Sequence, residues 1–113
     1  MLKRYSFEEV IQRANKATGL IPPEFCLWLT ENYHVWDAFV GQTEAVIDAG
    51  LKHYSARTII HVLRHHSALR ETGSAWKLNN DTSPYLARLF AILYPGHGNL
   101  FEYRTTNIER LAA

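Results

Sequence analysis

Five segments of this sequence repeat apolar residues at the three- and four-residue spacing of an amphipathic helix, with glycine or proline between them. The first helix is predicted to begin at Ser6, because Ser6 and Glu9 have the spacing of a capping box. It is predicted to end before Gly19, a residue type that commonly closes helices. A second, shorter helix is predicted to start at Pro22-Pro23, because proline suits the first turn. The chain is therefore expected to be mainly helical.

Three further helices are predicted along the rest of the chain. The third covers residues 33–49 and is closed by Gly50, and its apolar side chains fall on one stripe. The fourth is capped by Ser55 and covers residues 55–71. The fifth covers residues 82–94, starts in turn chemistry and is broken by the Pro-Gly pair that follows it.

Short alternating segments predict a small amount of β-structure beside these helices. Residues 75–79 and 100–105 alternate between apolar and polar side chains and are expected to pair as an antiparallel ribbon. Residues 52–54 fit either one short strand or an extended turn. The resulting order is close to that of a winged helix, except that the first wing strand precedes the last helix. The predicted fold is mainly α with a small antiparallel β-ribbon, a winged-helix-like helical bundle.

The size and composition of the chain indicate one ordinary globular domain. With 113 residues it is expected to form a single domain over 1–113, with N-terminal helices at 6–33 and the winged-helix-like part at 34–106. The lone Cys26 excludes an internal disulfide and fits a reducing compartment. Neither a signal peptide nor an apolar run of about 20 residues is visible, so we expect a cytoplasmic protein without membrane contact.

Four short runs of residues carry a resemblance to a family of small bacterial and phage proteins. It extends over roughly residues 32 to 105. It implies a prokaryotic or phage cytosolic setting, and it implies no catalytic residues. The runs are His53-Tyr54-Ser55-Ala56-Arg57, Lys77-Leu78-Asn79-Asn80-Asp81, Ala87-Arg88-Leu89 and Phe101-Glu102-Tyr103-Arg104.

A basic side of the fourth predicted helix is the first candidate binding surface. On a helical wheel its basic residues cluster opposite the apolar ones, and Lys52 lies just before the helix. Clustered basic side chains are what phosphate groups require of a protein. The alternative is an ordinary solvated helix face. The clustered residues are Arg57, His61, Arg64 and His65.

A second candidate surface lies at the start of the last helix. Asn79 and Asn80 precede this helix, and Arg88 is predicted on its outward side together with Ala87. If this helix enters a groove of DNA, asparagine and arginine there are suited to contact base edges. The alternative is that the two asparagines only shape a tight turn.

Catalytic and metal-binding patterns are weak. No nucleophile elbow, phosphate loop or dinucleotide fingerprint occurs, and Cys26 lies in an apolar run that suits an inert thiol. His61 and His65 have the spacing of a helical metal pair, but Arg64 beside them would repel a cation. We therefore expect neither an enzyme nor a bound metal or cofactor.

The sequence alone leaves two functions open. The first, which we favour, is a small regulatory protein that binds nucleic acid, DNA or RNA, through a helix-turn-helix-like pair of the fourth and last helices. The net charge of only +1 counts against it, although a homodimer would double a weak basic patch. The second is a protein–protein interaction module, such as a phage-encoded, anti-CRISPR-like inhibitor of a host defence system. Its interface would use Trp76, Tyr85 and Tyr103.

Overall fold

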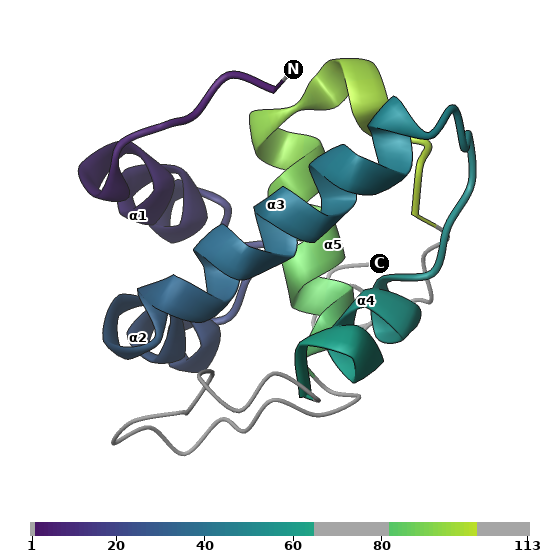
Figure 1. Ribbon diagram of the computed structural model, residues 1–113. Coiled ribbons are helices and arrows are strands. Elements are labelled where there is room, and N and C mark those ends of the chain that lie inside the picture. The colour runs from purple at the N-terminus through teal and green to yellow at the C-terminus, as the bar shows by residue number, and fades with distance from the viewer. Residues whose placement is uncertain (1, 65–81, 102–113) are drawn as a thin grey trace.

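The computed structural model describes residues 2–64 and 82–101, which form a bundle of helices (Figure 1). This confirms the expected mainly helical class. None of the helices in these two stretches has the length and apolar character that crossing a membrane requires. The helices are α1 (Phe7–Lys16), α2 (Pro23–Glu31), α3 (Tyr33–Asp48), α4 (Ala56–Arg64), α5 (Ser83–Leu93) and the short 3₁₀ helix η1 (Pro95–His97).

Helix α1 begins at the predicted cap. The backbone N–H of Glu9 donates to the Ser6 side-chain oxygen at 3.2 Å, and the Ser6 hydroxyl donates to the Glu9 carboxylate at 3.3 Å. The helix ends at Lys16, before the predicted stop at Gly19, and Gly19 does not adopt a positive φ. Gly19 therefore lies in the turn after the helix and is not its closing residue.

Helix α3 ends at the predicted glycine. Gly50 has a φ of +84°, the left-handed conformation that suits glycine. Its N–H donates to the carbonyl of Ile47 at 2.9 Å, and the N–H of Leu51 donates to that of Val46 at 3.3 Å. These two bonds form a Schellman motif, which fixes the direction in which the chain leaves α3.

Helix α5 is the centre of the bundle. It contacts α1, α3 and α4, and in Figure 1 it stands behind α3 with the other helices around it. The predicted core stripe is confirmed, as in the fully buried Leu86 and Phe90. The outward side was predicted to include Pro84 and Ala91 as well as Ala87 and Arg88, and it is wrong at the last two, because Ala87 is 1% exposed and Arg88 is 7% exposed. A helix enclosed by three others buries residues on more than one side, so a single apolar stripe underestimates its burial.

Backbone pairing between two distant segments replaces the predicted ribbon in the part of the chain that the structure describes. Tyr54 and Phe101 form an isolated parallel β-bridge, in which the N–H of Tyr54 donates to the carbonyl of Leu100 at 2.8 Å. No β-strand occurs within residues 2–64 and 82–101, so the winged-helix order is not seen there. The predicted strand at 75–79 and most of that at 100–105 lie outside the described residues.

A strap of residues 2–5 ties the start of the chain to the end of α5, which the sequence patterns did not predict. The Tyr94 hydroxyl donates to the carbonyl of Lys3 at 2.6 Å, and the Tyr5 hydroxyl donates to that of Leu93 at 3.1 Å. The two rings meet edge to face with centroids 5.5 Å apart. We call this reciprocal arrangement the tyrosine clasp.

Candidate functional site

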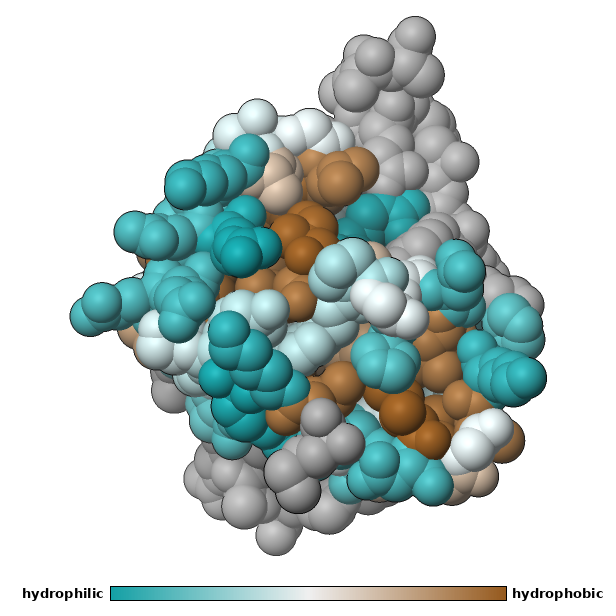
Figure 2. Space-filling model, turned by 90° about the horizontal axis from the view of Figure 1, so that it is seen from above, coloured by the Kyte–Doolittle hydropathy of each residue, from teal (hydrophilic) through white to brown (hydrophobic). Residues whose placement is uncertain are grey.

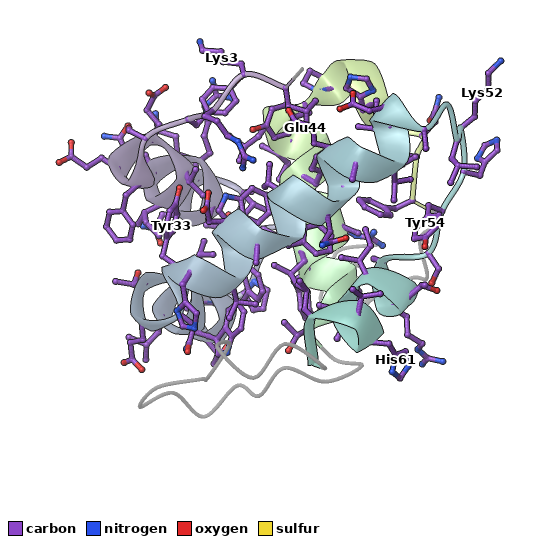
Figure 3. All side chains as sticks on the ribbon, in the orientation of Figure 1. Lys3, Tyr33, Glu44, Lys52, Tyr54 and His61 are labelled. Atoms are coloured by element: carbon purple, nitrogen blue, oxygen red, sulfur yellow. The ribbon has the colours of Figure 1, made fainter. Side chains whose placement is uncertain are left out.

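Helix α4 separates basic and apolar side chains sharply. The N–H of Thr58 donates to the side-chain oxygen of Ser55 at 3.3 Å, which confirms the predicted cap. The side facing the core is buried, as in Ile59 and Ile60. The opposite side and the loop before the helix are open to solvent. In Figure 3 the side chain of Lys52 lies at the upper right of the molecule and that of His61 at the lower right. We define the basic face as the exposed side chains of Lys52, His53, Arg57 and His61.

The basic face belongs to a part of the sequence without acidic residues. Residues 49–70 contain four Lys or Arg and no Asp or Glu. Residues 2–48 contain four Lys or Arg and seven Asp or Glu, a net charge of −3. Neither Lys52 nor Arg57 forms an ion pair with a described residue. The near-neutral net charge of the whole chain therefore hides a local positive surface on α4.

A groove of about 360 Å³ lies next to the basic face, between the end of α3 and the segment that follows α5. Figure 2 views the molecule from above and shows apolar surface open to solvent among hydrophilic side chains. Lys52 contributes to the groove as well as to the basic face. The groove is lined by Ile47, Gly50, Leu51, Lys52, Gly96, His97, Asn99 and Leu100.

The predicted nucleic-acid contacts divide into three groups. Lys52, Arg57 and His61 are exposed and lie on α4 and the loop before it, and their contact with nucleic acid stays a prediction. Arg88 was predicted to point outward, and this is wrong because α3 and α4 help to enclose α5. The side chain of Arg64 and all of His65, Asn79 and Asn80 lie outside what the structure describes.

The predicted protein interface is described at one position only. Tyr85 is half-buried, and its ring packs against Phe25 with centroids 5.7 Å apart. This contact joins α5 to α2, so much of the Tyr85 ring is part of the core packing. Trp76 and Tyr103 lie outside the described residues, so an aromatic interface stays a prediction.

Within residues 2–64 and 82–101, no three His, Cys, Asp or Glu side chains gather as metal ligands would. Cys26 is 8% exposed, and burial raises the pKa of its thiol. A thiol held in its neutral form is a poor nucleophile and a poor metal ligand.

The groove was not predicted from the sequence, because the residues that line it belong to two separate turns. His97 and Asn99 follow the break after α5, and Leu51 follows α3, so about 46 residues separate the two walls. The sequence feature that could have pointed to the groove is the apolar Leu51 next to Lys52, directly after the glycine that closes α3. Leu51 is 47% exposed, yet nothing in the spacing shows what lies opposite.

Comparison of the chain with protein-family models, with curated proteins and with solved structures found no match in any of the three.

Proposed function

We propose that this protein binds nucleic acid without catalysing a reaction, and that its basic face contacts the phosphate backbone. The observation that supports this is the separation of charge, because α4 and its leading loop present exposed cations without an acidic neighbour in sequence. Phosphate contacts of this kind supply most of the affinity in sequence-independent binding. A regulatory role is part of the proposal, and its prokaryotic or phage setting comes from the sequence resemblance alone.

The proposed contact differs from a helix-turn-helix. In the predicted helix-turn-helix-like pair, Arg88 of α5 would contact base edges. Arg88 is 7% exposed and therefore does not project into solvent as such a contact requires. Binding through α4 therefore favours contacts to phosphates over direct readout of bases by α5.

The expected strength of the effect follows from the number of cations. α4 and the loop before it contain three Lys or Arg residues, Lys52, Arg57 and Arg64, and we take each as one phosphate contact. Each contact contributes about 0.7 to 0.9 to the slope of log affinity against log salt. Three contacts therefore weaken binding about 20- to 40-fold between about 50 mM and about 200 mM salt.

The test is fluorescence anisotropy with labelled DNA of mixed sequence, as a duplex and as a single strand, at these two salt concentrations. Lys52→Ala/Arg57→Ala is expected to weaken binding and to reduce the salt effect to about threefold, because one contact remains. Arg13→Ala/Lys16→Ala removes the same charge from α1, in the acidic part of the chain, and is the matched control.

The control variant is expected to bind as the unmodified protein does. Equal losses in the two double variants would show a general charge effect and refute the assignment to α4. No binding of either DNA form at low salt would refute nucleic-acid binding as the function.

A further inference from the structure

We propose that the groove beside Lys52 holds an unpaired nucleobase, so that the nucleic acid recognised is single-stranded. This inference deepens the proposed function and rests on it. It concerns the class of nucleic acid that the basic face accepts.

The walls of the groove are fixed by backbone hydrogen bonds. The Schellman motif at Gly50 sets one wall, as described above. On the other wall the N–H of His97 donates to the carbonyl of Tyr94 at 2.9 Å, and the N–H of Leu100 donates to that of His97 at 3.1 Å. The bond from Tyr54 to Leu100 then joins the two segments. The groove is therefore formed before a ligand arrives, which lowers the entropy lost on binding.

The chemistry of the lining matches a flat heteroaromatic ring. Ile47, Leu51 and Leu100 supply apolar surface, and the exposed His97 and Asn99 lie beside it. A nucleobase has apolar faces that stack on imidazole and aliphatic surface, and polar edges that pair with an amide. The volume of about 360 Å³ lies at the lower end of the range for small-ligand sites.

Lys52 links the groove to the basic face. It lines the groove and also belongs to the basic face, five residues before the exposed Arg57 of α4. A strand whose phosphates follow the basic face therefore brings a sugar and base next to the groove. Bases in a duplex are paired and stacked inside the helix and do not reach such a site without being extruded.

The experiment compares four oligonucleotides of about 12 nucleotides: a thymine DNA strand, a uracil RNA strand, a DNA strand of abasic sites and a DNA duplex. The abasic strand keeps its phosphates and lacks only its bases. The thymine or the uracil strand is expected to bind at least about fivefold more tightly than the abasic strand, the effect of one stacked base. The better of the two identifies the type of strand.

Paired variants locate the base. Leu51→Ser and His97→Ala are expected to reduce binding of the thymine or uracil strand to the level of the abasic strand. Leu27→Ser is the matched control, because Leu27 is an exposed leucine on α2, 58% exposed and outside the groove. It is expected to change nothing.

The outcomes separate the two proposals. Equal, salt-sensitive binding of all four oligonucleotides would overturn the groove assignment and leave the basic face standing. A base-dependent gain that survives Leu51→Ser and His97→Ala would also overturn it, since the base would then bind elsewhere. No binding of any oligonucleotide would overturn the proposed function itself.

Discussion

Replacing Tyr94 by phenylalanine tests the tyrosine clasp, which joins the first described residues to the end of α5. The substitution removes the hydroxyl that donates to the Lys3 carbonyl at 2.6 Å and keeps the ring that packs on Tyr5. Tyr94 is 8% exposed, whereas Lys3 is exposed, so water can satisfy the abandoned carbonyl. A neutral hydrogen bond of this kind contributes about 1 kcal/mol to the free energy of unfolding.

The assay is urea unfolding of the two proteins at neutral pH, followed by tryptophan fluorescence. A loss of about 1 kcal/mol lowers the urea midpoint by about 0.3 to 1 M, because the unfolding free energy of a small protein falls by about 1–3 kcal/mol per molar urea. Tyr54→Phe is the control, because the Tyr54 hydroxyl makes no hydrogen bond to any residue in the described stretches. It is expected to change the unfolding free energy by less than about 0.5 kcal/mol.

The pH dependence gives a second measure of the same hydroxyl. Burial raises the pKa of Tyr94, although Arg4 acts in the opposite direction. In the unfolded chain a tyrosine ionises at about pH 10, so as the pH rises the hydroxyl loses its proton in the unfolded state before it does so in the folded protein. The contribution of Tyr94 to the free energy of unfolding is therefore fully present below about pH 10, and it is lost as the pH rises through the raised pKa that Tyr94 has in the folded protein.

Phenylalanine cannot ionise, so the stability difference between the unmodified protein and Tyr94→Phe is expected to shrink above about pH 10. Burial also raises the pKa of Tyr33, so some alkaline loss of stability persists in the variant. An unchanged urea midpoint at neutral pH, or a difference that grows with pH, would refute the clasp as a stabilising contact.

Two further predictions concern the glycines and the cysteine. Gly50→Ala is expected to lower the free energy of unfolding by about 1–2 kcal/mol, because it forces a side chain into the left-handed region. Gly19→Ala is expected to be neutral or slightly stabilising, because no atom lies within 4 Å of the added Cβ. Equal losses of stability in thermal melts of the two variants would contradict this. Cys26 is expected to react slowly with a thiol reagent in the folded protein and rapidly in urea, because its side chain is buried and burial raises the pKa of its thiol. Fast labelling of the folded protein would contradict the packing of α2.

The sequence predicted local structure well where the signal was local. The cap at Ser6 and the stop at Gly50 depend on residues within one turn of each other, and the structure confirms both. The burial of Trp36 and Phe39 follows from spacing along one helix and is also confirmed. Gly19 shows the limit of such signals, because the same residue type after a helix does not always close it.

The features that the sequence could not predict depend on segments far apart in the chain. Spacing along α5 identifies one apolar stripe, but it does not reveal that neighbouring helices also cover Arg88. The groove needs Leu51 and His97 to face each other, and no pattern in either segment specifies the other. The exposed cations of α4 were predicted, because their position requires only the helical period and the cap at Ser55.

The central position of α5 has a consequence for the order in which the chain assembles. Helices α1 to α4 precede it, so during synthesis they leave the ribosome with the apolar surfaces that α5 will cover still facing water. The contacts between α1 and α5 join residues roughly 70 to 85 positions apart, and such pairings slow folding because a long loop must close first. The bundle is thus completed late, and until then its partly built core is the surface on which unwanted association would begin.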